Sequence, residues 1–196
     1  MKKIILMVIF CKLLLILQNK AFADDAILKK VYFAGGCFWC MEESFDKIDG
    51  VIQSISGYSG GKLKNPTYQD VIYKDTGHVE TIEITYDSNK VSFEELLNTF
   101  WKNIDPFDKY GQFCDKGKSY RSVIFYENNI QKKIINKTIT NIETKFDAKV
   151  VTLLWEFQKF YKAEDYHQDY YQKNFLRYLA YKKACQREEV LKKIWN

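Results

Sequence analysis

The sequence predicts an α+β protein in which helices pack as a second layer on a mixed, mostly antiparallel sheet. Short apolar or alternating runs, typical of strands, recur between segments with helical spacing. Some connections have hairpin length and others are long enough for crossovers, which favours a two-layer sandwich over a doubly wound parallel sheet. Apolar residues make up 46% and aromatic residues 16% of the 196 residues, enough to bury a core, which excludes a disordered or fibrous chain.

The first elements are a strand, a tight turn and a helix. Residues 31–34 form an apolar run that stops at Gly35-Gly36, as expected where a strand leads into a helix. A helix is predicted over residues 38–48, because its apolar side chains fall on one stripe: Phe38, Met41, Phe45 and Ile48.

Later segments continue the alternation of strands and helices. Residues 52–58 alternate weakly and residues 79–86 clearly, as in strands, and Ser92 with Glu95 forms a capping box that opens a helix over residues 93–103. A strand at 122–126, a helix over 129–146, a strand at 150–154 and an aromatic-rich helical tail from about Tyr166 follow. We expect a ferredoxin-like core with a C-terminal tail of helix and coil.

Residues 1–23 have the pattern of a secretory signal peptide. Lys2 and Lys3 precede an apolar run, and Ala21-Phe22-Ala23 provides a small-x-small ending, so cleavage is expected after Ala23. Lys12 interrupts the run and argues against a permanent membrane span. We expect a single domain over residues 24–196 in an exported protein, periplasmic or extracytoplasmic, with no stable membrane insertion after processing. A retained amphipathic anchor and a misassigned start are the alternatives.

The net charge of +5 comes mostly from this first segment, which holds four lysines and no acidic residue. The remaining chain is close to neutral and has no clustered basic stripe or base-reading motif, which argues against a nucleic-acid partner. Cys11 also lies in the segment, so the five cysteines of the chain fall to four after cleavage.

The segment Gly35-Gly36-Cys37-Phe38-Trp39-Cys40 carries the sharpest chemical signal. The glycines allow a tight turn, and Cys37 then lies at a helix start, where free N–H groups and the helix dipole favour a thiolate. Cys40 follows one helical turn later, close enough to attack a partner sulfur. We interpret the pair as redox thiols, with two structural cysteines as the alternative. No second Cys or His pair has zinc-site spacing, so no metal is expected.

Seven motifs in register make the chain resemble the peptide methionine sulfoxide reductase A family, which is specific for the S epimer of methionine sulfoxide. The resemblance runs from about Val31 to Trp195. The motifs begin with Gly-Cys-Phe-Trp after Ala34-Gly35 and continue with Gly57-Tyr58-Ser59-Gly60-Gly61, Asn65-Pro66-Thr67-Tyr68, Gly77-His78-Val79-Glu80, Asp105-Pro106, Tyr120-Arg121-Ser122 and Ala163-Glu164-Asp165-Tyr166-His167-Gln168.

The resemblance implies that Cys37 attacks the sulfoxide sulfur, that Glu80 is the acid, and that Tyr68 and Tyr120 donate hydrogen bonds to the sulfoxide oxygen. These residue types suit the chemistry, because that oxygen needs a proton in the transition state. A glutamate supplies one near neutral pH only if burial raises its pKa, and tyrosine hydroxyls add neutral donors. A solvent-facing strand position for Glu80 and simple core packing for the tyrosines are the structural alternatives.

Further residues are implied around this centre. Phe38 and Trp39 match the apolar wall that receives the substrate methyl group, and Asp115 matches an aspartate that supports the hydrogen-bond network, although an ordinary turn residue is its alternative. We expect His78 and His167 to serve structural hydrogen bonds, since the acid of the family is a glutamate.

Recycling requires a second thiol, which condenses with the sulfenic acid left on Cys37 to give a disulfide. Cys185, Cys40 and Cys114 are all candidates. Many family members use a mobile C-terminal tail, which favours Cys185, whereas Cys40 needs no large motion but lies within one helical turn. The expected substrates are oxidised methionine in proteins and free methionine sulfoxide, with thioredoxin or another dithiol as reductant and no bound cofactor.

Two other functions are alternatives to sulfoxide reduction. A thioredoxin-like disulfide oxidoreductase would explain the CxxC motif, but that fold usually places a cis-proline opposite the pair. Neither Pro66 nor Pro106 begins a convincing strand. A non-enzymatic module that binds a methionine side chain would not need Cys37.

Overall fold

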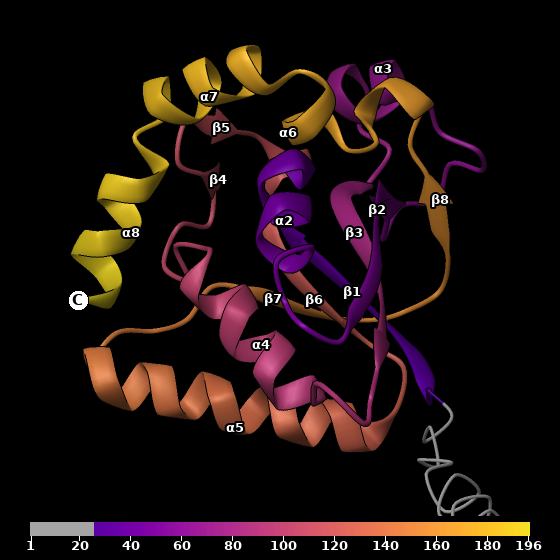
Figure 1. Cartoon of the computed structure of the whole chain (residues 1–196). Helices are drawn as coiled ribbons and strands as arrows, with labels where there is room; N and C mark the ends of the chain where they lie inside the picture. Colours follow the sequence, from indigo (N-terminus) through magenta and orange to yellow (C-terminus); the bar gives the residue numbers. More distant parts are fainter. Residues whose placement is uncertain (1–25) are drawn as a thin grey trace, which may run out of the picture.

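Six strands form one mixed sheet in the computed structural model, which describes residues 26–196 (Figure 1). Their order is β7-β6-β1-β3-β2-β8. Neighbouring strands are antiparallel except β6 and β7, which run parallel. The bounds are Leu28–Gly35 for β1, Val51–Ser59 for β2, Val79–Asp87 for β3, Ser122–Tyr126 for β6, Leu153–Glu156 for β7 and Phe160–Lys162 for β8. The expectation of a mixed, mostly antiparallel sheet is confirmed.

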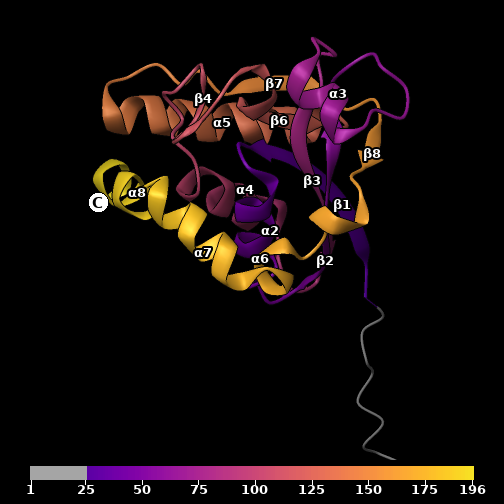
Figure 2. The same cartoon turned by 90° about the horizontal axis from the view of Figure 1, so that it is seen from above.

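The four central strands and two crossover helices form the ferredoxin-like core. Helix α2 (Phe38–Phe45) connects β1 to β2, and α4 (Phe93–Lys102) lies between β3 and β6. The central order β6-β1-β3-β2, with antiparallel neighbours, is that of a βαββαβ unit. Helix α5 (Asn129–Phe146) packs beside α4 (Figures 1 and 2). The fold therefore belongs to the predicted α+β class.

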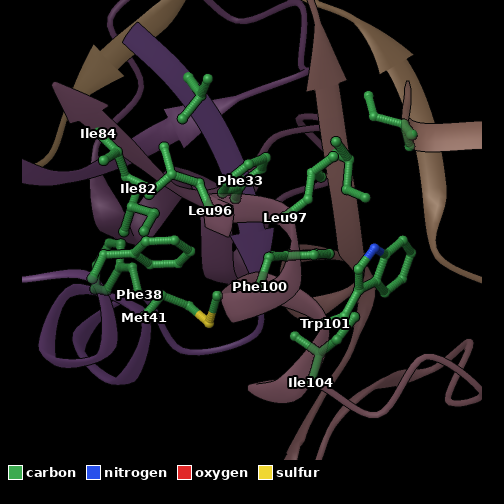
Figure 3. Packing of buried hydrophobic residues seen from close by; sticks show 14 of the residues in the cluster. Phe33, Phe38, Met41, Ile82, Ile84, Leu96, Leu97, Phe100, Trp101 and Ile104 are labelled. Carbon is green, nitrogen blue, oxygen red and sulfur yellow. The ribbon is translucent and has the colours of Figure 1, made fainter. Parts of the chain in front are cut away.

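Side chains of β1 divide between two hydrophobic clusters, one on each face of the sheet. Val31 and Phe33 belong to the larger cluster, which includes residues of the helices, whereas Tyr32 and Ala34 belong to the smaller one. This division follows from the alternation of side chains along a strand. Figure 3 shows the larger cluster, in which the rings of Phe33 and Phe100 lie 5.1 Å apart. The face that carries α2 is thus the densely packed one.

The turn between β1 and α2 requires glycine at position 36. Gly36 has φ +79°, and a Cβ there would lie 2.5 Å from the Cβ of Gln112. Gln112 has no room to move, because its side-chain amide donates to Asp105 O at 2.9 Å and accepts from Asp105 N at 2.7 Å. The turn delivers Cys37 to the N-cap position of α2.

The C-terminal segment returns to α2 after β8. Figure 2 shows its helices running past α2 toward the C-terminus. The ring of Trp39 stacks on Tyr170 with centroids 3.7 Å apart, and Trp195 Nε1 donates to Ile104 O at 3.1 Å. The tail is therefore fastened both to α2 and to the residues after α4. Its elements are the 3₁₀ turn η2 (Asp165–His167), α6 (Tyr170–Lys173), α7 (Phe175–Ala184) and α8 (Arg187–Trp195).

Some boundaries differ from the sequence prediction. The helix expected over 38–48 ends at Phe45, since Gly50 at φ +95° turns the chain into β2. Strand β7 begins at Leu153 rather than at residue 150, because Val150 N donates to Glu143 Oε1 and Val151 N donates to Pro106 O instead. Elements that the sequence did not predict are α3 (Tyr68–Tyr73), β4 (Gly111–Gln112), β5 (Asp115–Lys116), the 3₁₀ turn η1 (Lys118–Tyr120) and β8.

The predicted signal peptide, residues 1–23, lies outside the described residues and stays a prediction. Within residues 26–196, the helices are too short or too polar to cross a membrane.

Glu42 is the buried carboxyl that joins α2 to the tail. Both of its oxygens lie 3.2 Å from Asp169 N, which donates to them, and Oε2 also accepts from the Ser56 hydroxyl at 3.4 Å. Burial raises the pKa of Glu42 to about 7. Near neutral pH the folded protein therefore holds a proton here that the unfolded chain has released.

This carboxyl makes stability depend on pH. The Glu42 pKa rises on folding from 4.5 to about 7, so its contribution is fully present below pH 4.5 and is lost as the pH passes 7. Between pH 4.5 and 7, the free energy of unfolding of the wild type should fall by about 3 kcal/mol at most because of this group. Glu42→Gln should not show this fall. Denaturant unfolding at a series of pH values measures the difference, with the exposed Glu94→Gln as control. A wild-type-minus-variant difference that stays constant with pH would contradict the assignment.

Candidate active site

A cavity of about 110 Å³ lies where α2 begins. Its walls come from the start of α2, from α3, β3, the segment of β5 and η1, and α7. The structure thus brings together all seven residues that the resemblance places around the substrate, from four separate parts of the sequence, and adds an eighth. The lining residues are Cys37, Phe38, Trp39, Tyr68, Glu80, Asp115, Tyr120 and Tyr181.

Cys37 is the N-cap residue of α2. Its carbonyl oxygen accepts hydrogen bonds from Cys40 N at 3.2 Å and from Met41 N at 3.4 Å. The residue is only 5% exposed, so its sulfur is reached from the cavity rather than from open solvent. Cys37 and Cys40 belong to one buried cluster, and each influences the pKa of the other.

Burial raises the pKa of Cys37 well above its ordinary value, and the interaction with Cys40 raises it further. The interaction with Cys37 is the main reason that the pKa of Cys40 is lowered to about 6, and the charge of Arg187 adds to it. The sequence predicts a thiolate on Cys37, whereas these shifts favour a thiolate on Cys40 in the resting site.

Glu80 lies on β3 and is 2% exposed, which rules out the solvent-facing alternative. Its Oε2 accepts a hydrogen bond from Phe38 N at 3.0 Å. Burial raises the pKa of Glu80 well above its ordinary value despite that hydrogen bond. Burial therefore favours the protonated carboxyl, which can act as an acid toward a group in the cavity.

Tyr68 and Tyr120 reach the cavity from α3 and η1. Burial raises the pKa of Tyr68 to about 12 and that of Tyr120 above its ordinary value. Glu164 Oε1 accepts from Tyr68 N at 2.8 Å and fixes the start of α3. Both side chains are neutral hydrogen-bond donors at physiological pH.

Asp115 and Tyr181 close the cavity on the side of the tail. The Tyr181 hydroxyl donates to Asp115 Oδ2, and burial raises the pKa of Asp115. Sequence reasoning missed Tyr181, because its position depends on how α7 returns to α2. The available signal was its place in a helical repeat with Tyr178 and Cys185, three positions before it and four after it.

Two aromatic side chains form the apolar wall. Phe38 is 1% exposed and packs into the core, while Trp39 is half-buried. Trp39 is held in place by its stacking on Tyr170 and by the hydrogen bond from its Nε1 to His167 Nδ1 at 3.2 Å. These contacts hold both aromatic side chains of the wall in place.

The two histidines serve hydrogen bonds outside the cavity. His78 Nδ1 accepts from Gly61 N at 3.2 Å, so its Nε2 donates to Leu63 O at 2.8 Å. His167 accepts from Trp39, and burial lowers the pKa of His167 to about 4, so its ring is neutral. Neither ring lies beside Cys37 as the base of a dyad.

The four cysteines of the described chain divide into two pairs. Cys37 and Cys40 are free and buried. Cys114 and Cys185 form a disulfide with their Cα atoms 5.0 Å apart. Of the three candidates for the recycling thiol, only Cys40 is therefore both free and in contact with Cys37.

Comparison with known proteins decides the family. A family model described as peptide methionine sulfoxide reductase matches residues 29–196. The chain belongs to this family. It is accordingly a peptide-methionine sulfoxide reductase, a thiol-dependent oxidoreductase, which decides against the thioredoxin-like alternative.

Individual relatives agree with this assignment. Peptide methionine sulfoxide reductase MsrA of Streptococcus uberis is 43% identical over 171 residues, which cover 86% of this chain and 100% of that protein. Reduced Mxr1 of Saccharomyces cerevisiae has a TM-score of 0.72 at 29% identity and covers 80% of this chain and 91% of its own. Methionine sulfoxide reductase A of Corynebacterium diphtheriae has a TM-score of 0.68 at 29% identity, with 75% of each chain covered.

Proposed function

We propose that this reductase acts on the S epimer of methionine sulfoxide, in proteins and as the free amino acid, through attack by Cys37. The observation that carries the proposal is the single small cavity in which the Cys37 thiol, a protonated Glu80 and two tyrosine hydroxyls meet. One group attacks the sulfoxide sulfur there while the others bind and protonate its oxygen.

The first step transfers the sulfoxide oxygen to Cys37. The Cys37 sulfur, after losing its proton, attacks the sulfoxide sulfur, and Glu80 gives its proton to the oxygen. The sulfur–oxygen bond of the substrate breaks, and methionine leaves with a sulfenic acid remaining on Cys37. The sulfoxide is reduced and Cys37 is oxidised by two electrons. Tyr68 and Tyr120 stabilise the oxygen as charge develops on it.

The walls of the cavity support selection of one epimer. Its donors lie on Glu80, Tyr68 and Tyr120, whereas Phe38 and Trp39 offer only apolar surface and a methyl group suits them. With the sulfur facing Cys37, the oxygen among the donors and the methyl group on the wall, only one direction remains for the rest of the substrate. The opposite epimer would place its oxygen on the apolar wall, where it would lose its hydrogen bonds.

Cys40 is the thiol that we propose for resolution. Its thiolate attacks the sulfur of the Cys37 sulfenic acid, a Cys37–Cys40 disulfide forms, and the hydroxyl leaves as water after taking up one proton. Two electrons from a dithiol of the thioredoxin type then restore both thiols. A complex of yeast Mxr1 with Trx2, solved as a crystal structure, is in line with a reductant of this type.

We also propose that the chain is exported, on the basis of residues 1–23. Cell fractionation of the expressed full-length chain, with N-terminal sequencing of the product, tests this. A mature N-terminus at Asp24 outside the cytoplasm is expected. An uncleaved cytoplasmic product would overturn it.

Cys37→Ser is expected to abolish sulfoxide reduction, because serine is a far weaker nucleophile and cannot form the disulfide. The assay separates the two epimers of a methionine sulfoxide peptide with dithiothreitol as reductant, and circular dichroism checks the fold. Wild type should consume only the S epimer. Retained activity in Cys37→Ser would contradict the mechanism, and so would insulin reduction by wild type without sulfoxide turnover.

Glu80→Gln is expected to lower kcat/KM by about 10²-fold or more, since the amide has no proton to transfer. Glu83→Gln is the matched control. That carboxylate lies on the same strand but binds Lys30 at 2.6 Å and does not line the cavity. A near-wild-type rate for Glu80→Gln would reassign the proton donor.

Cys40→Ser is expected to release one methionine per enzyme and then stop with the sulfenic acid on Cys37. Peptide mapping after one turnover should show Cys37 linked to Cys40 in wild type and a dimedone adduct on Cys37 in the variant. A wild-type link from Cys37 to Cys185 or Cys114 would instead assign resolution to that cysteine.

A further inference from the structure

The free cysteines Cys37 and Cys40 line different cavities. Cys37 lines the 110 Å³ cavity described above, whereas Cys40 lines a second cavity of about 330 Å³ between α2 and the tail. The two cavities share no lining residue. Asn103, Lys182 and Arg187 are among the other residues of the second cavity. The environment of Cys40 is therefore set by a different group of side chains.

Arg187 is the unusual member of this group, because its guanidinium is buried without a carboxylate partner among residues 26–196. The residue is 3% exposed. Its Nη2 donates to Asn103 O at 2.6 Å and contacts Met41 Sδ at 3.4 Å, and its guanidinium lies 4.4 Å from the centre of the Phe113 ring. A buried cation of this kind is costly unless an anion lies nearby. The charge of Arg187 lowers the pKa of two groups, Asp115 and Cys40, and of these only Cys40 lines the same cavity as Arg187.

The remaining charges near Cys40 do not replace Arg187. Lys182 already pairs with Glu43 at 2.9 Å and with Glu188 at 3.0 Å, and Lys47 pairs with Glu43 at 2.7 Å. Asp115 acts on Cys40 with the opposite sign from Arg187, and the charge of Cys40 in turn raises the pKa of Glu80. The titratable and charged groups that face Cys40 are Cys37, Glu80, Asp115, Tyr178, Tyr181 and Arg187, with Glu43, Lys47, Lys182 and Glu188 around the cavity.

Oxidation of Cys37 removes the other main interaction that stabilises the Cys40 thiolate. In the resting site, the interaction with the Cys37 thiol is the largest cause of the lowered Cys40 pKa. Once Cys37 is a sulfenic acid, that thiol no longer exists. The charge of Arg187 and the hydroxyl of Tyr178 then remain to favour the Cys40 thiolate.

The Cys114–Cys185 disulfide is close in the sequence to Arg187 and to the ring that Arg187 contacts. Phe113, on which the guanidinium lies, immediately precedes Cys114, and Arg187 follows Cys185 by two residues. The disulfide therefore links the turn between α7 and α8 covalently to the loop that contains Phe113.

We propose that Arg187 stabilises the Cys40 thiolate during resolution and that the Cys114–Cys185 disulfide holds Arg187 in position. Arg187 is a positioning residue, and it takes no part in the first step. The reaction it assists forms the Cys37–Cys40 bond, breaks the sulfur–oxygen bond of the sulfenic acid and releases water. This inference rests on the proposed resolving role of Cys40.

The test is the pH profile of resolution in a single turnover. Enzyme with Cys37 and Cys40 reduced and the Cys114–Cys185 disulfide intact is mixed with substrate without reductant and quenched over time, and mass spectrometry follows conversion of sulfenic acid to disulfide. Loss of a cation raises a thiol pKa. Arg187→Gln should therefore move the midpoint of the plot of resolution rate against pH upward by about one pH unit or more. Arg187→Lys should move it by less than half as much, and the control Lys182→Gln should leave it near wild type.

Each result separates this inference from the proposed function. One methionine released per enzyme in every variant shows that the first step is intact. A wild-type midpoint in Arg187→Gln would then overturn the role of Arg187. Persistent sulfenic acid on Cys37 in wild type, at every pH, would instead overturn resolution by Cys40.

A second variant tests the disulfide and covers the case in which Arg187→Gln does not fold. Cys114→Ser/Cys185→Ser keeps Arg187 and both reacting thiols, and it should still form the Cys37–Cys40 bond. Its midpoint should move upward in the same direction as that of Arg187→Gln. An unchanged midpoint would overturn the proposed part of the disulfide.

Discussion

The hydrogen bond from Phe38 N to the Glu80 carboxyl is the interaction on which the site depends. The first turn of a helix leaves backbone N–H groups without partners, and a buried carboxyl without a partner costs about 1–3 kcal/mol. Each group here satisfies the other at 3.0 Å, which fixes the start of α2 against β3. The same contact sets Cys37 and Glu80 on one small cavity. Because one carboxyl oxygen accepts from the backbone, the other is left to carry the proton that burial keeps on Glu80.

Desolvation decides how charge is distributed around this contact. Burial raises the pKa values of Glu80 and of the two tyrosines and lowers that of His167, so it favours the neutral form of all four groups. Two negative charges on adjacent buried sulfurs are unfavourable, so the pair tends to keep one proton. The pKa shifts favour that proton on Cys37 and the thiolate on Cys40, which lines the same cavity as Arg187.

Local patterns predicted the core, and the motifs predicted most of the site. The apolar run before Gly35-Gly36, the capping box at Ser92 and the alternation along β3 report interactions between near neighbours, which a sequence displays directly. Tyr181 and the Cys114–Cys185 disulfide escaped prediction because they depend on contacts between residues 66 to 71 positions apart. The raised pKa of Cys37 escaped prediction for a related reason. A helix start is visible in the sequence, but the burial that raises this pKa is not.

The tail gives the two faces of α2 their different chemistry. Its Tyr181 closes the substrate cavity against Asp115, while its Arg187 reaches the cavity of Cys40. The pair of sulfurs lies between these two environments, one helical turn apart, so oxidation on one face can be passed to the other without rearranging the core. The C-terminal helices therefore add to a difference between Cys37 and Cys40 that begins with the interaction of the two thiols themselves.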